Sequence, residues 1–194
     1  MLRRIKIFII FVLVFGGGYA AYRFIRSSSV PLNFTDARLQ GALIAQNIVN
    51  LSNQSASDID KINELDKEGD YTAALNLTTD VIRRSAEIRD RAVELSAQME
   101  KMIKALSEID NFDARQAALE AISSRLALLS RLINYSGYLG QLLDVLRGRF
   151  TGVSQGSQEV QTLVDQINSE VAAINNFNSQ AAQAMDRFDK IVNQ

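Results

Sequence analysis

Apolar residues recur at alternating steps of three and four through most of this chain, which is the spacing of the buried face of an α-helix. The pattern is clearest between residues 71 and 106, where a heptad seam continues without a break for about 35 residues. Its positions are Tyr71, Ala74, Thr78, Val81, Ser85, Ile88, Ala92, Leu95, Met99, Met102 and Leu106. The spacing predicts a long helix that packs against other helices in the manner of a coiled coil.

Two later segments repeat this spacing, and one earlier segment shows a weaker form of it. The third predicted helix has its seam at Leu119, Ile122, Leu126, Leu129, Ile133, Ser136, Gly140 and Leu143. The fourth has its seam at Val160, Val164, Ile167, Val171, Ile174, Asn178, Ala181, Met185, Phe188 and Val192. The first is carried by Ile44, Ile48, Leu51, Ser55, Ile62 and Leu65, and it is diluted by serine and asparagine around Asn53. We expect four helices, with three helices and a loosely attached first helix as the alternative.

Short breaks separate the predicted helices. They lie at Lys67–Asp70, at Asp110–Phe112 and at Gly148–Gly156. Because short connections force neighbouring helices to run antiparallel, the sequence predicts an all-α, up-down bundle about 50 Å long, with coiled-coil-like packing. Since Thr35 is suited to the N-cap of the first helix, we expect a linker at residues 28–34 and the bundle at residues 35–194.

The N-terminal segment has the pattern of a membrane anchor. Residues Ile7 to Tyr22 carry no charge, and Lys6 and Arg23 close the run. As a helix this run spans about 24 Å, so snorkelling by the two flanking cations would complete a hydrocarbon core of about 30 Å. The residues expected to anchor the segment in the bilayer are Lys6, Phe8, Phe11, Phe15, Tyr19, Tyr22 and Arg23. We predict that residues 1–27 form an N-terminal transmembrane helix, single-pass, with a cytoplasmic N-terminus.

A cleaved signal peptide is the alternative reading of the same segment. Met1 to Lys6 would be its basic region, Ile7 to Phe15 its apolar region, and Gly18 to Ala20 its small-residue cleavage site. Both readings predict an extracytoplasmic bundle, in the periplasm or outside the cell. A helix buried in the core of a cytoplasmic protein is the third reading, and the triple glycine from Gly16 disfavours it.

The missing residue types restrict the chemistry. The chain contains no histidine and no cysteine, which removes the commonest general base, thiolate catalysis and the usual ligands of metal sites. We therefore predict no enzyme activity, no metal site and no cofactor. Five of the 21 basic residues lie in residues 1–27, which leaves 16 against 22 acidic residues and a net charge of about −6 in the remainder. An acidic domain is a poor match for a phosphate backbone, so nucleic acid is not an expected partner.

The end of the third predicted helix is the strongest candidate for a working surface. Leu128, Leu132, Tyr135, Leu139, Leu142 and Leu146 form a second apolar stripe beside the seam. A helix that is apolar on two faces is either the most buried helix or one that presents a stripe to a partner. The glycines within it predict a close helix approach or a bend, and the loop beyond it has the composition of an interaction hot spot. The candidate interaction residues are Tyr135, Gly137, Gly140, Arg147, Arg149 and Phe150.

Three polar residues interrupt the seams, namely Ser85, Ser136 and Asn178. Such residues either fix the register of packed helices or face water at a loose end of a bundle, and the sequence leaves both readings open. Other charged groups, such as the arginines and acids from Arg83 to Glu94, are typical of a solvated helix face.

These observations favour a membrane-tethered extracytoplasmic scaffold or interaction protein that acts through coiled-coil surfaces and the loop after residue 147. The alternative is a sensor or carrier that holds a small apolar molecule between helices. The expected partners are the lipid bilayer, an envelope protein that the sequence does not identify, and further copies of the chain as a homo-oligomer.

Overall fold

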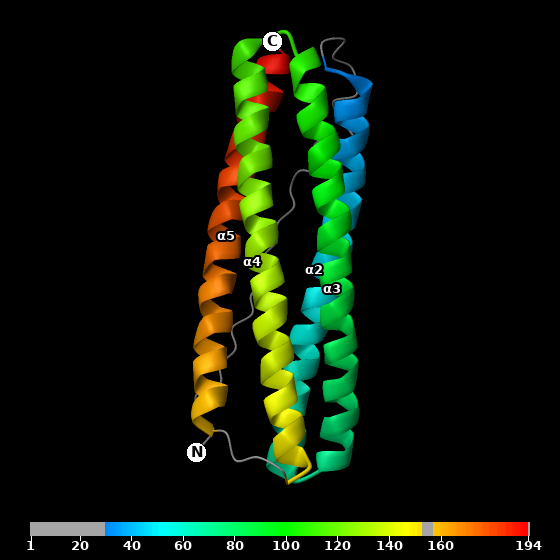
Figure 1. Cartoon of the computed structure of the whole chain (residues 1–194), viewed down its shortest axis with the longest axis vertical. Helices are drawn as coiled ribbons and strands as arrows, with labels where there is room; N and C mark the ends of the chain where they lie inside the picture. Colours follow the sequence, from blue (N-terminus) through cyan, green and yellow to red (C-terminus); the bar gives the residue numbers. More distant parts are fainter. Residues whose placement is uncertain (1–29, 153–156, 194) are drawn as a thin grey trace.

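The computed structural model describes residues 30–152 and 157–193, and this part of the chain is helical without strands (Figure 1). The helices are α2 (Leu32–Glu68), α3 (Tyr71–Ala105), the short 3₁₀ helix η1 (Leu106–Glu108), α4 (Phe112–Phe150) and α5 (Ser157–Val192). The four long helices run up and down beside one another, so the predicted helical bundle is confirmed. We call its two ends the Gly69 end and the Asn111 end, after the turns that lie there.

The turns have the local chemistry that helix ends require. Gly69 adopts a φ of 79° and ends α2, a left-handed conformation that glycine tolerates best. Asp70 and Asn111 cap α3 and α4 by accepting hydrogen bonds from the backbone N–H groups of Ala73 and Ala114, each at 3.0 Å. The first helix begins at Leu32 rather than at Thr35, so the end of the predicted linker is helical.

The seams predicted for the second and fourth helices lie in the core. In α3 every seam position from Ala74 to Met102 is buried, and only the first, Tyr71, is exposed. In α5 the seam is buried except at Asn178 and Val192, which are half-buried. An unbroken three-four spacing therefore located the buried face of these two helices correctly.

Helix α2 packs along α3 through small residues, which explains its weak apolar pattern. Gly41, Ser52 and Ser55 are buried positions of α2. A Cβ added at Gly41 would lie 3.1 Å from the terminal methyl carbon Cε of Met99, so the two helices are in close contact there. The serines that diluted the pattern thus occupy core positions, and the alternative of a loosely attached first helix is wrong.

The seam predicted for α4 is half wrong. Leu119, Leu126 and Ile133 are exposed, while the second apolar stripe is buried from Leu128 to Leu142. Because α4 packs closely against both α3 and α5, its buried arc is centred on the second stripe, and one row of the heptad faces outward. Over this stripe, α4 is therefore the most buried helix, which was one of the two interpretations of its two apolar faces.

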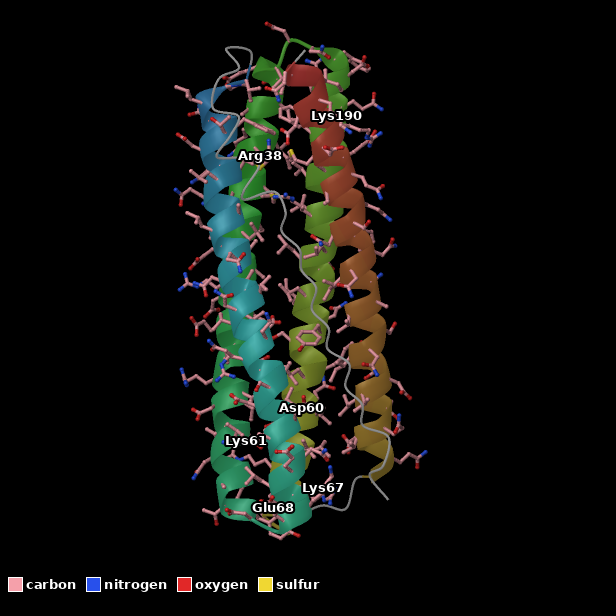
Figure 2. All side chains as sticks on the ribbon, turned by 180° about the vertical axis from the view of Figure 1, so that it is seen from behind. Arg38, Asp60, Lys61, Lys67, Glu68 and Lys190 are labelled. Atoms are coloured by element: carbon pink, nitrogen blue, oxygen red, sulfur yellow. The ribbon has the colours of Figure 1, made fainter. Side chains whose placement is uncertain are left out.

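The fourth side of the bundle is closed differently from the other three. The successive pairs α2–α3, α3–α4 and α4–α5 pack closely, whereas the backbones of α2 and α5 approach each other less closely. Side chains join these two helices at the Asn111 end, where the rings of Phe34 and Phe188 lie 5.2 Å apart and Arg38 binds Asp189. Figure 2 shows this side, with Arg38 near one end of the bundle.

A buried pair of serines fixes α3 against α4. The hydroxyl oxygens of Ser85 and Ser136 lie 2.7 Å apart, and each hydroxyl donates to the other residue's backbone carbonyl, at 3.2 and 2.8 Å. Both residues are almost fully buried. These two seam serines are paired in the core rather than exposed to water, and the pairing is satisfied in one register of the helices only.

We predict that Ser85→Ala and Ser136→Ala each lower the free energy of unfolding by about 1–2 kcal/mol, because each leaves a buried hydroxyl with fewer partners. The double variant should lose less than the sum of the two, by at least about 0.5 kcal/mol. Denaturant unfolding of the four proteins measures both quantities. Ser96→Ala, at an exposed hydroxyl of α3, is the control and should stay within about 0.5 kcal/mol. Strict additivity would contradict a coupled pair.

Candidate interaction surfaces

Two of the three predicted tip residues hold the bundle together at the Gly69 end. Arg149 Nη2 lies 3.2 and 3.1 Å from the two carboxylate oxygens of Asp66, whose side chain is only 7% exposed. Phe150 is buried, and its ring lies 5.9 Å from that of Tyr71. These contacts tie the end of α4 to the end of α2 and the start of α3. Arg147 is exposed.

The other three candidates lie within α4. Tyr135 is fully buried among the core residues, and burial raises the pKa of its hydroxyl well above the ordinary value. A Cβ added at Gly137 or Gly140 would meet no atom within 4 Å. Neither glycine marks a close approach of helices inside this chain, although each costs roughly 1 kcal/mol relative to alanine. Packing within the chain does not explain them.

Two apolar cavities within the described part of the bundle are too small for an organic ligand. One, near the Gly69 end, measures about 40 Å³ and is lined by α2, α4 and α5 residues such as Ile62, Leu146 and Val164. Another, in the middle of the core beside Leu132, measures about 10 Å³. Ligand pockets typically measure about 300–1,000 Å³. The carrier hypothesis stays a prediction that these cavities do not support.

An open groove lies between α4 and α5 toward the Asn111 end. It has a volume of about 830 Å³ and is lined mainly by polar residues, including Ser123, Gln180 and Gln183. An ion pair between Arg187 and Glu120 crosses it. Hydrogen bonds from Gln116 and Arg187 lower the pKa of Glu120 below its usual value. Exposed ion pairs of this kind contribute little to stability or to specific binding.

A cluster of charges closes the bundle at the Asn111 end. The guanidinium of Arg38 donates to both carboxylate oxygens of Asp189, at 2.6 and 2.7 Å. Arg125 of α4 lies near this pair. Burial lowers the pKa of Arg125 to about 10; the nearby charge of Arg38 lowers this pKa further, whereas the charge of Asp189 raises it. Sequence reasoning missed this cluster.

The outward face of α4 carries four exposed large apolar side chains, one every seven residues. They are Phe112, Leu119, Leu126 and Ile133. Other exposed apolar side chains, such as Leu43 of α2 and Val93 of α3, do not form a row of this length. Single exposed apolar residues are normal on protein surfaces, whereas a continuous row is typical of a contact surface.

The predicted membrane anchor, from Lys6 to Arg23, and the loop residues 153–156 lie outside the described residues. None of the helices in residues 30–152 and 157–193 combines the length and the apolar character needed to cross a membrane. In the same residues, no group of three or more acidic side chains is arranged to hold a metal ion.

No protein-family model, no curated protein and no solved structure matches this chain.

The structure predicts that the tip arginines differ in their effect on stability. Arg149→Ala should lower the free energy of unfolding by about 1–3 kcal/mol, because it leaves the carboxylate of Asp66 buried without its partner. Arg147→Ala removes the same side chain from an exposed position two residues away and should change stability by less than about 0.5 kcal/mol. Chemical denaturation of both variants measures the difference. Equal effects would show that Arg149 lies as free in solution as Arg147.

Proposed function

We propose that this chain is a membrane-tethered, extracytoplasmic helical scaffold that acts through protein contacts on the outward face of α4. The observation that carries the proposal is the row of exposed apolar side chains from Phe112 to Ile133. This row supports a contact with another helix because its spacing of seven residues matches the repeat of a coiled coil.

The interior of the bundle supports the same choice. The core is filled by side chains from all four helices, and the two apolar cavities of about 40 and 10 Å³ have room for only a few water molecules. A carrier of an apolar ligand would have to separate its helices to make room. A scaffold needs only a rigid body and a surface, and both are present in the described residues.

The tether rests on the pattern of residues 1–27. Sixteen uncharged residues lie between Lys6 and Arg23, and three basic residues precede them with no acidic residue. That distribution favours an N-terminus on the cytoplasmic side and a bundle on the other side. With such a tether, the Asn111 end of the bundle would lie near the bilayer, because α2 begins there.

Membrane fractionation with N-terminal sequencing of the mature protein tests the tether. We expect the full chain, with Met1 or its direct successor at the N-terminus, in membranes that resist carbonate extraction. External protease should digest the bundle of intact spheroplasts or cells.

The control for this experiment is the double variant Ile10→Arg with Val14→Arg. Each arginine costs about 2.5–3.5 kcal/mol at the centre of a membrane helix, so the variant should leave the carbonate-resistant fraction. A mature N-terminus near Ala21 in the soluble fraction would contradict the tether and support a cleaved signal peptide instead.

A further inference from the structure

The bundle consists of two helical hairpins, α2–α3 and α4–α5. The two helices of each hairpin pack closely, whereas α3 and α4 share a smaller contact and α2 and α5 approach each other less closely. The chain connects the two hairpins through η1 and the turn to Asn111. In this connection the backbone of Ile109 leaves the 3₁₀ conformation for an extended one. A few residues at the ends of helices are where hinge motions usually take place.

The two apolar cavities described above lie between the hairpins. The cavity of about 40 Å³ is lined by Ile62 of α2 and by Leu142 and Val164 of the second hairpin. The cavity of about 10 Å³ is lined by Ala45 of α2 and by Leu132 of α4. Atoms that line a cavity lack contacts on one side. The surface between the hairpins is therefore packed incompletely at both places.

Polar contacts join the hairpins at both ends and in the middle. Arg38 binds Asp189 at the Asn111 end, Arg149 binds Asp66 at the Gly69 end, and the serine pair of α3 and α4 lies between them. When the hairpins separate, water solvates both partners of each contact, which offsets much of the interaction that is lost. A surface with such contacts therefore opens at a smaller cost than an apolar surface of the same area.

Each hairpin has contacts of its own that a separation would leave intact. In the first hairpin, Arg84 Nη1 of α3 lies 2.8 Å from Asp58 Oδ2 of α2. In the second, Glu170 of α5 is buried, and its Oε1 lies 3.6 Å from Arg131 Nη1 of α4. Both hairpins thus have the internal contacts of units that move as rigid bodies.

We propose that the two hairpins separate as units about the η1 connection, with the widest opening at the Gly69 end. There the separation breaks the contact of Arg149 with Asp66 and the ring contact of Phe150 with Tyr71. It uncovers the second apolar stripe of α4, which includes the cavity residue Leu142. The bundle then presents its apolar inner surface in the open form only. Such an opening needs neither the proposed tether nor the outward face of α4.

Introduced cysteines measure the opening, because the chain contains no cysteine of its own. Ala45→Cys places a thiol beside the cavity between the hairpins. Gly41→Cys, one turn earlier on the same helix, is the matched control, because the three atoms nearest to a Cβ there belong to α3 side chains. Both full-length variants are labelled in detergent micelles with a charged methanethiosulfonate reagent, over a series of urea concentrations. The labelling rate relative to that of the unfolded chain gives the fraction of molecules that expose the thiol.

We expect the thiol of Ala45→Cys to react at least about 10-fold faster than that of Gly41→Cys. Its rate should also rise less steeply with urea than the unfolding equilibrium does, because separated hairpins expose less surface than an unfolded chain. Equal rates, or a urea dependence equal to that of unfolding, would overturn the proposal. Circular dichroism verifies that each variant is folded, and the urea dependence of Ala45→Cys decides the question without the control.

A substitution inside one hairpin gives an independent test. Asp58→Asn removes the ion pair with Arg84, which the open form keeps and the unfolded chain loses. It should speed up the labelling of Gly41→Cys at least about 3-fold and leave that of Ala45→Cys within about 2-fold. Ser85→Ala removes a contact between the hairpins, so it should speed up the labelling of both cysteines by similar factors. If Asp58→Asn accelerates both cysteines equally, the thiols are exposed by unfolding of the whole bundle and the hairpins do not separate as units.

Discussion

The ion pair between Arg38 and Asp189 joins the first bundle helix to the last, and the closed shape of the bundle depends on it. Three sides of the bundle are made by successive antiparallel helices that pack closely. The fourth side, between α2 and α5, is held by side chains. Arg38 donates two hydrogen bonds to Asp189, beside the rings of Phe34 and Phe188. Both partners of an ion pair that is mostly shielded from water are needed, because a buried charge without its partner destabilises the fold. This pair and the Arg149–Asp66 pair therefore hold α2 in place at the two ends.

Closure of the bundle decides which surface of α4 remains for function. Since α3 and α5 both pack on α4, its wide apolar arc is used inside the bundle, and the row from Phe112 to Ile133 is left outside. The tip is likewise used inside, because Phe150 and Arg149 contact α3 and α2. These two outcomes move the proposed working surface from the end of the bundle to its side. Figure 1 looks onto that side, with α3 and α4 nearest to the viewer.

Much of the fold could be predicted from the sequence, because an unbroken heptad has one buried face. The positions from Ala74 to Met102 and from Val160 to Ile174 are such cases. The prediction failed for α4, where two stripes competed, and periodicity alone does not say which of them faces two neighbours. The prediction was weak for α2, because its buried serines and Gly41 do not count as apolar positions in a hydrophobic pattern. The antiparallel topology brings the start of α2 and the end of α5 together, so an ion pair there could have been predicted. The sequence does not show, however, that Arg38 and Asp189 are the charged residues that become buried.

Hydrogen exchange measured residue by residue tests the closure of the bundle most directly, with Asp189→Asn compared with Asp186→Asn. Asp186 is a suitable control because its carboxylate pairs with Lys190 at an exposed position on the same helix. In Asp189→Asn we predict at least about 10-fold faster exchange in the halves of α2 and α5 at the Asn111 end, which corresponds to a loss of about 1.4 kcal/mol. The centres of α3 and α4 should change less. Exchange in Asp189→Asn that matches the control along all four helices would contradict the view that this ion pair closes the bundle.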